Sequence, residues 1–231
     1  MKKRSNAIIL VIACVLGILF LIQVYNLRAM FATTAAKTPP NMNIDMETES
    51  SPLERKCSDA VDKLVDLNIN FLAIDFDQTM IDIHTGGRWK ETVGELMQHL
   101  RPVFLQLVPI ATQRNIRIAI VTFSPQTNHI REVLEHAFPT IAEIIPIRGN
   151  DQTWTYEGNG MKLGKQEHMA SAAEELMTKP ALGVTDIRKN TTLLIDDDPR
   201  NIKKSLKDGT RAVWFNPRDP DRLLHDILRL K

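Results

Sequence analysis

The stretch FLAIDFDQT, residues 71–79, decides how the fold of this chain is interpreted. Four apolar residues lead directly into Asp75 and Asp77, and Thr79 follows. Side chains of a strand alternate between its faces, so a strand through this stretch would direct both carboxylates the same way. Two carboxylates so close together repel each other, and a cation bound between them would offset that repulsion. The stretch therefore predicts a buried strand that ends in a charged site.

The chain after residue 55 alternates between strand-like and helical patterns. Apolar runs that predict strands occupy residues 71–76, 116–124, 141–149, 191–198 and 210–215. Helical patterns occupy residues 57–68, 91–115, 126–137, 165–177, 199–208 and 219–230. Pro102 and Pro109 are expected to break or kink the second of these helices. Alternating helices and unbroken apolar strands predict an α/β fold, a doubly wound, three-layer, Rossmann-like parallel sheet.

Polar side chains also close other predicted strands. Thr122 ends the second strand, and three aspartates, residues 196–198, end the fourth. Ligands of such sheets bind beyond the carboxyl ends of the strands, so these groups are expected to converge with the first acidic pair. Either acidic cluster alone is also typical of a helix cap, and we assign Asp198 to capping a helix that begins at Pro199. The two clusters together favour a Mg²⁺ site, because hard oxygen ligands select that ion.

These motifs resemble those of the haloacid dehalogenase superfamily of hydrolases. DFDQT matches the first motif, DxDx[TV], Thr122 in IAIVTFS matches the second, and IDDDPRNI matches the acidic fourth. The third motif is a lysine, for which Lys162 and Lys165 are candidates, and the surrounding GKQEHM favours Lys165. The likeness covers residues 71–215 and is greatest to the capless, magnesium-dependent phosphatases of the superfamily.

The resemblance implies a role for each matching residue. Asp75 is the expected nucleophile, which forms an aspartyl-phosphate, and Asp77 is the expected general acid and base. Thr122 is expected to bind a phosphoryl oxygen, and Lys165 to neutralise charge on the phosphoryl group and on Asp75.

The resemblance also implies how Mg²⁺ would be held. Asp75, Asp196 and the backbone carbonyl of Asp77 are the expected ligands, and Asp197 is expected to hold a water molecule of the ion. Asp198 has no expected part in the chemistry.

The expected function is therefore Mg²⁺-dependent hydrolysis of phosphomonoesters. Residues 77–122 and 122–165 leave no room for a cap domain, so an open site suited to phosphoproteins or other bulky groups is expected. The segment Ile81–Trp89, with Gly86 and Gly87, is expected to form a hairpin flap over it. Two alternatives stay open. One is a non-catalytic, membrane-tethered binding protein of the same fold, and the other is a phosphatase of small metabolites such as nucleotides or sugar phosphates.

The composition sets broad limits. The chain has 231 residues, of which 43% are hydrophobic, enough for one domain with a substantial core. Its net charge of +1 gives no electrostatic reason to expect a nucleic-acid partner. Two cysteines, Cys14 and Cys57, are too few for a disulfide framework or a zinc site.

The N-terminal residues predict attachment to a membrane. Three cations at residues 2–4 precede the uncharged, largely aliphatic residues 7–27, a run about as long as a bilayer requires. We predict a cytoplasmic tail at residues 1–6, a transmembrane signal anchor at 7–27, a flexible stalk at 28–54 and the hydrolase domain at 55–231, on the lumenal or extracellular side. The alternative is a signal peptide cleaved near ATTAA, residues 32–36, which would give a secreted protein.

Overall fold

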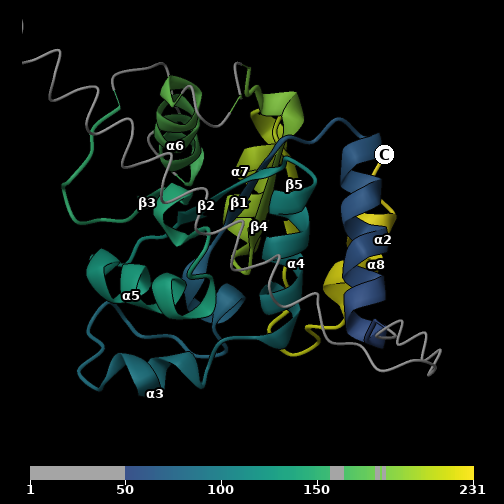
Figure 1. The fold of residues 1–231 in the computed structure, drawn as a ribbon. Helices are drawn as coiled ribbons and strands as arrows, with labels where there is room; N and C mark the ends of the chain where they lie inside the picture. Colours follow the sequence, from purple (N-terminus) through teal and green to yellow (C-terminus); the bar gives the residue numbers. More distant parts are fainter. Residues whose placement is uncertain (1–49, 157–163, 180–182, 184–185) are drawn as a thin grey trace, which may run out of the picture. The chain divides into compact units, whose positions relative to one another are not determined.

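A computed structural model of the chain describes residues 50–156, 164–179, 183 and 186–231. Within these residues, five parallel strands form one sheet in the order β3-β2-β1-β4-β5 (Figure 1). The strands are β1 (Phe71–Ile74), β2 (Arg117–Val121), β3 (Ile147–Arg148), β4 (Thr192–Asp196) and β5 (Arg211–Trp214). The predicted α/β fold with a parallel, Rossmann-like sheet is confirmed.

The strand order places a switch point in the middle of the sheet. From β1 the chain moves outward to β2 and β3, and it then returns to the other side of β1 to form β4 and β5. Ligands of such sheets bind outside the carboxyl ends of the strands at the point where the order reverses. The carboxyl ends of β1 and β4 are therefore the place to look for a site.

Two layers of helices cover the two faces of the sheet, because alternate strand residues point to opposite sides. Leu72 and Ile74 of β1 belong to the larger core, together with α2 (Pro52–Asp66), α4 (Pro102–Gln113), α5 (Thr127–Ala137) and α8 (Arg222–Leu228). Phe71 and Ala73 belong to the smaller core on the other face, where α6 (Gln166–Thr178) and Ile202 of α7 (Pro199–Lys207) pack. Both faces of β1 are thus buried, and the strand ends at the site with little freedom to move.

The first helix begins earlier than the sequence pattern suggested. Ser51 accepts a hydrogen bond from the backbone N–H of Glu54, whose side chain accepts one in return from the Ser51 backbone N–H. This capping box and Pro52 in the first turn start α2 at Pro52. The domain therefore includes residues that were predicted to belong to the stalk, which was expected to reach residue 54.

Two other predicted elements differ in detail. The long helix expected at residues 91–115 is two helices, α3 (Val93–Met97) and α4, and Pro102 begins the second one. Pro109 lies inside α4 and does not end it. The third strand has only two residues, because a short helical turn, Ala142–Ile144, takes up the first part of the apolar run.

The predicted tail, the membrane anchor and all of the stalk before residue 50 lie outside the described residues. Among the residues that are described, no helix is long and apolar enough to cross a membrane. Cys57 is a buried free thiol in α2, and Cys14 lies outside the described part of the chain.

Candidate active site

Asp75 and Asp77 lie in a turn rather than in the first strand, which ends at Ile74. The backbone N–H of Asp75 donates to the carbonyl of Ile195 in β4, at 2.9 Å. Gln78 then adopts a left-handed conformation with φ of 62°, which breaks the regular turn Phe76–Met80. Both carboxylates line one cavity, as predicted, but the shape of this turn places them there and not the alternation of strand side chains.

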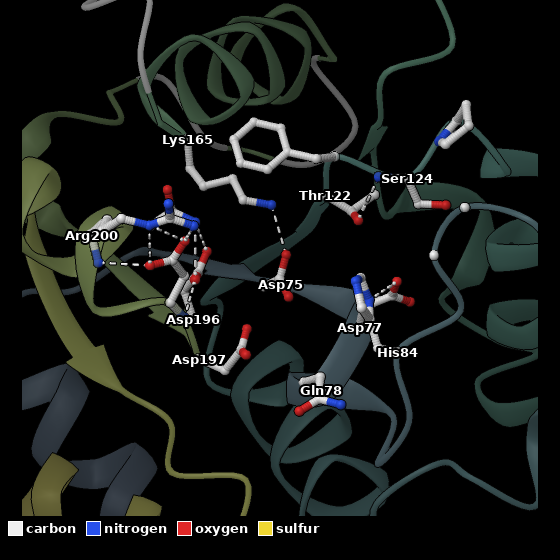
Figure 2. Close-up of a pocket in the computed structure, with 16 residues that line it drawn as sticks. Asp75, Asp77, Gln78, His84, Thr122, Ser124, Lys165, Asp196, Asp197 and Arg200 are labelled. Carbon is white, nitrogen blue, oxygen red and sulfur yellow. Dashed lines mark hydrogen bonds and ion pairs between the residues drawn. The ribbon is translucent and has the colours of Figure 1, made fainter.

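Asp75 forms a buried ion pair with Lys165, which directly precedes α6. The ammonium Nζ lies 2.6 Å from Asp75 Oδ1 (Figure 2). It donates a second hydrogen bond to the Val121 carbonyl at 2.7 Å. It also lies 4.2 Å from the centre of the Phe123 ring. Lys165 is 1% exposed and Asp75 is 6% exposed, so the pair is shielded from water. The predicted lysine is thus in contact with the predicted nucleophile, and Lys162 lies outside the described residues.

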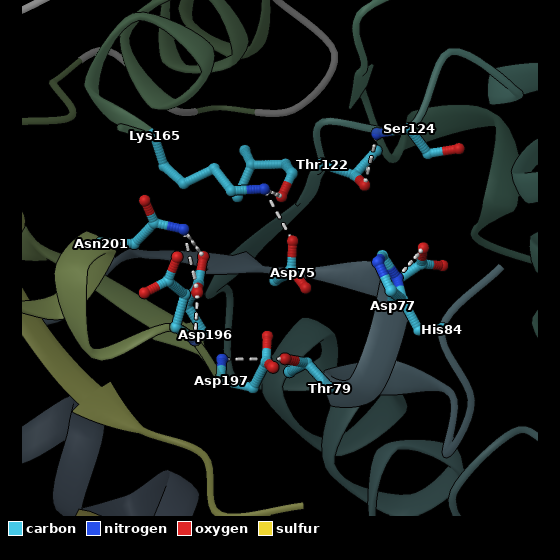
Figure 3. A network of polar contacts seen from close by, with 12 residues as sticks. Asp75, Asp77, Thr79, His84, Thr122, Ser124, Lys165, Asp196, Asp197 and Asn201 are labelled. Atoms are coloured by element: carbon cyan, nitrogen blue, oxygen red, sulfur yellow. Dashed lines mark hydrogen bonds and ion pairs between the residues drawn. The ribbon is translucent and has the colours of Figure 1, made fainter. Parts of the chain in front are cut away.

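The second acidic cluster stands beside this pair, at the end of β4. Asp196 is fully buried, and its two oxygens accept hydrogen bonds from the Asn201 amide at 3.1 and 2.9 Å. The Asp197 backbone N–H donates to Thr79 Oγ1 at 3.1 Å, which joins the β4 end to the turn after β1 (Figure 3). Asn201 and Thr79 were not singled out from the sequence. Thr79 is part of the DFDQT motif, and Asn201 lies in the same IDDDPRNI motif as Asp196.

Asp198 plays the structural role predicted for it. Its side chain accepts a hydrogen bond from the Arg200 backbone N–H at 2.8 Å at the start of α7. The Arg200 guanidinium also pairs with this carboxylate, which lowers the pKa of Asp198. Its charge is therefore neutralised locally.

Asp75, Asp196 and Asp197 have raised pKa values, chiefly because burial disfavours their charged form. Burial and the nearby Asp75 raise the pKa of Asp196 to about 7. The same two causes raise the pKa of Asp197 to about 6. Burial also raises the pKa of Asp75, against the lowering effect of Lys165. Asp75, Asp196 and Asp197 thus lie near the buried cation Lys165. An additional cation bound in the site would stabilise their charged forms.

No group of three or more His, Cys, Asp or Glu side chains within the described residues is arranged to hold a metal ion by itself. The predicted Mg²⁺ site uses only two direct side-chain ligands, Asp75 and Asp196, with the Asp77 carbonyl and water. Mg²⁺ keeps several waters and is usually bound through one or two carboxylates. The all-oxygen donors and the excess of buried negative charge fit such an ion.

Thr122 follows β2 and is 2% exposed. Its hydroxyl oxygen accepts a hydrogen bond from the Ser124 backbone N–H at 3.1 Å. Both residues line the cavity with Asp75 and Lys165. The hydroxyl proton of Thr122 is free to point at an oxygen in the cavity, as its predicted role requires.

Asp77 is held by the flap segment, Ile81–Trp89. Its carboxylate accepts hydrogen bonds from His84 and Thr85 of that segment. Gly86 and Gly87 both have positive φ, and the Arg88 N–H donates to the Thr85 carbonyl, as in turns that close hairpins. No strand pair flanks this turn in the described chain. The hairpin prediction is therefore wrong, because Ile81 instead forms an isolated bridge with Leu100.

The cavity has a volume of about 600 Å³. Its lining includes the predicted catalytic and metal-binding side chains, together with the flap glycines: Asp75, Asp77, Thr122, Lys165, Asp196, Asp197, Gly86 and Gly87. The structure thus brings all the described candidate residues together. Asp75, Lys165, Asp196 and Asp197 form the part of the cavity that we call the acidic floor. The Thr122 hydroxyl lies at one side of it.

No protein-family model matches the chain, and no curated protein matches it. The chemistry of the cavity is therefore the basis on which a function is assigned.

Proposed function

We propose that the chain is a Mg²⁺-dependent phosphatase that hydrolyses phosphomonoesters through an aspartyl-phosphate. The observation that carries this proposal is the contact of 2.6 Å between Lys165 Nζ and Asp75 Oδ1, at the floor of a cavity shared with Thr122 and Asp196. Lys165 occupies one oxygen of Asp75, and Asp75 Oδ2 is the oxygen that attacks phosphorus. The sequence motifs and the strand order also support a fold like that of the haloacid dehalogenase superfamily.

In the first step a bond forms between Asp75 Oδ2 and phosphorus while the bond from phosphorus to the leaving oxygen breaks. Lys165 and the Thr122 hydroxyl stabilise the negative charge on the phosphoryl oxygens. Asp77 gives its proton to the leaving oxygen, so an alcohol departs rather than an alkoxide. In the second step Asp77 takes a proton from water, the hydroxide attacks phosphorus, and Asp75 is released with inorganic phosphate.

Mg²⁺ would be held by Asp75, Asp196 and the Asp77 carbonyl, with Asp197 bonded to a metal-bound water. When bound, the ion would supply positive charge beside the transferred group. Asn201 fixes the orientation of Asp196, and Thr79 fixes the start of the Asp197 loop. The pKa values of Asp196 and Asp197 are raised because burial and the nearby Asp75 disfavour their charged forms. A bound cation would favour the charged forms and lower these pKa values.

The test uses the full chain, purified in detergent because of the predicted anchor. Phosphate release from p-nitrophenyl phosphate is measured with Mg²⁺ and with EDTA. We expect activity only with Mg²⁺, and no activity when Asp75 is replaced by Asn. A Mg²⁺-loaded protein that folds but releases no phosphate from a broad panel of esters would favour the non-catalytic binding protein.

We propose phosphorylated proteins as the substrate class. In the described chain, the flap segment lines the cavity together with Phe123 and Arg200, and no separate cap domain lies between the elements, so little encloses a small molecule. Closure over a substrate is what strengthens electrostatics in a site. The comparison is kcat/KM for phosphopeptides against nucleotides and sugar phosphates. A metabolite hydrolysed a hundredfold better than any peptide, about 2.7 kcal/mol, would contradict this proposal.

We also propose that residues 7–27 anchor the enzyme, with the catalytic domain lumenal or extracellular. Protease added outside sealed vesicles tests the orientation. Digestion of the catalytic domain from the cytosolic face would show the opposite topology, and a fully soluble mature protein would show signal cleavage and secretion.

A further inference from the structure

The carboxylate of Asp77 is held by two neighbouring residues of the flap segment, which we call the polar clamp: His84 and Thr85. We infer that the polar clamp positions Asp77 for proton transfer to the leaving group. This inference rests on the proposed phosphatase function. In Figure 3, Asp77 and His84 lie together, across Asp75 from Asp196. The acid–base group is thus held from a part of the chain separate from the acidic floor.

The contacts leave the two oxygens of Asp77 unequal. Oδ2 faces His84 Nδ1 at 2.9 Å, the Thr85 backbone N–H at 3.2 Å and Thr85 Oγ1 at 2.8 Å. Among the residues that the structure describes, Oδ1 has one hydrogen-bond partner, Thr85 Oγ1 at 3.0 Å. An ionised carboxylate only accepts, so His84 donates from Nδ1 when Asp77 is ionised or carries its proton on Oδ1. Oδ2 is therefore saturated with donors, and Oδ1 is the oxygen left to carry a proton and transfer it.

The Thr85 hydroxyl is itself oriented. The Gly87 backbone N–H donates to Thr85 Oγ1 at 3.2 Å and occupies a lone pair of that oxygen. The single hydroxyl proton is then directed at Asp77, because a threonine hydroxyl has only one donor. A valine at position 85 would keep the shape of the side chain and lose this donor.

The flap segment that carries the polar clamp is fixed at both ends. The Gln78 N–H donates to the Ile83 carbonyl at 2.9 Å before the clamp. After it, the Gln126 side chain accepts from the Trp89 N–H at 2.6 Å and donates to the Trp89 carbonyl at 2.9 Å. Gln126 follows β2, so the segment bridges the turn after β1 and the loop after β2. These bonds fix the position from which His84 and Thr85 reach Asp77.

The position of Asp77 matters because a general acid must lie within hydrogen-bond reach of the oxygen that it protonates. Without the polar clamp, the carboxylate would sample other rotamers, and only a fraction of molecules would be ready to donate. Proton transfer from Asp77 contributes most to the rate when the leaving oxygen departs poorly without a proton. A residue with a merely structural role would lower the rate by the same factor for every leaving group.

The test therefore compares two aryl phosphates whose leaving groups differ by one nitro substituent, phenyl phosphate and p-nitrophenyl phosphate, using the full chain with Mg²⁺. The nitro-substituted phenol departs readily without a proton. For Thr85→Val we expect kcat/KM to fall at least tenfold more with phenyl phosphate than with p-nitrophenyl phosphate. Thr85→Ser, which restores the hydroxyl, should rescue this pattern. Lys90→Ala, at an exposed position just after the segment, is the matched control and should show neither change.

His84 gives a second variant that does not depend on Thr85. Its side chain is 68% exposed, so His84→Ala should fold. We expect the same leaving-group pattern, smaller than in Thr85→Val, and recovery in His84→Asn, whose amide can replace Nδ1 as a donor. In an Asp77→Asn background, Thr85→Val should cause no further loss, because the group that it positions is already gone.

Two outcomes would overturn the inference in different ways. Equal losses with both esters in Thr85→Val and His84→Ala, beside an unequal loss in Asp77→Asn, would overturn the polar clamp and leave the phosphatase standing. Wild-type protein without activity on either ester, or on any other, would overturn the proposed function and the inference with it.

Discussion

The acidic floor and the flap segment differ in burial and in the interactions that hold them in place. The floor residues Lys165 and Asp196 are 1% and 0% exposed and lie at the ends of packed strands and helices. In the flap segment, the His84 side chain is 68% exposed and is held by a turn and hydrogen bonds. Charges interact strongly where water is excluded, and a general acid acts only within hydrogen-bond reach of the oxygen that it protonates. The comparison predicts large, general effects from changes in the floor and smaller, selective effects from changes in the flap segment.

The largest effect is expected for Asp75→Asn. An amide is a poor nucleophile toward phosphorus, so phosphate release should fall at least a thousandfold, about 4 kcal/mol of transition-state stabilisation. The loss should be equal for phenyl and p-nitrophenyl phosphate, unlike that of a clamp variant. Phosphate release and the melting temperature are measured together. A folded Asp75→Asn protein with near wild-type turnover would contradict the assignment of the nucleophile.

Lys165→Met tests the electrostatics of the floor. Removing one partner of a buried pair costs about 3–5 kcal/mol when the other charge stays. Without Lys165, Asp75 can bind a proton and become neutral, and it does so more readily at lower pH. The loss of stability should therefore be smaller at pH 6 than at pH 8. Denaturant unfolding at the two pH values measures this.

The double variant Asp75→Asn/Lys165→Met is the control for that change. It removes both charges and should recover part of the stability lost in Lys165→Met. A loss that is the same at both pH values, with no recovery in the double variant, would show that Lys165 acts by packing alone.

The pKa of Asp196, raised to about 7, predicts how stability depends on pH without metal. Between the unfolded pKa near 3.9 and this value the folded state binds more protons, so stability falls as pH rises through it. Asp197, with a pKa of about 6, acts in the same sense. The pKa of His168, lowered to about 4 by burial, acts in the opposite sense below pH 6.5. The total stability of the wild type is therefore a poor measure of the site.

The difference between wild type and Asp196→Asn isolates the group. In EDTA, the variant should gain about 1–2 kcal/mol relative to wild type between pH 6 and pH 8, since only the wild type must then bury the charge. Mg²⁺ at pH 8 should raise the melting temperature of the wild type and leave that of Asp196→Asn nearly unchanged. A pH-independent difference would mean that Asp196 is already charged at pH 6.

The floor could be predicted from the sequence because short motifs at the ends of apolar strands specify it. Asp75 and Thr122 directly follow β1 and β2, Asp196 ends β4, and the parallel order brings these strand ends together. The sheet itself followed from the alternation of apolar runs with helical patterns. Of the five strands, β3 differs most from its prediction, since its apolar run divides between a helical turn and two strand residues.

The flap segment could not be predicted in the same way. The contacts of Asp77 with His84 and Thr85 depend on a turn whose path is set by the positive φ at Gln78 and by bonds to Gln126. Nothing in the order of residues 81–89 gives that path, and the glycines suggested a hairpin instead. Long-range hydrogen bonds of loops leave no periodic pattern in a sequence.

The smallest effect is expected for Gly87→Ala, which tests whether the close packing of Gly87 against Pro125 holds the flap segment in position. A Cβ at Gly87 would lie 2.7 Å from Pro125 Cδ, closer than such atoms approach, while a Cβ at Gly86 would meet nothing within 4 Å. Both positions have similar positive φ, 67° and 62°, so alanine at either one carries a similar backbone strain of about 1–2 kcal/mol. Gly86→Ala is therefore the matched control, and any additional loss in Gly87→Ala comes from the contact with Pro125.

The rigid ring of Pro125 can yield only if the segment moves, and the Gly87 N–H that orients the Thr85 hydroxyl would move with it. We expect Gly87→Ala to melt about 2–4 °C below Gly86→Ala, as a further 1 kcal/mol would produce in a domain of this size. It should also lower kcat/KM a few-fold more with phenyl phosphate than with p-nitrophenyl phosphate, and Gly86→Ala should lower both alike. If the two variants melt together and show the same ratio between esters, Pro125 does not seat the segment. The position of Asp77 then depends on the hydrogen bonds of His84, Thr85 and Gln126 without the contact at Pro125.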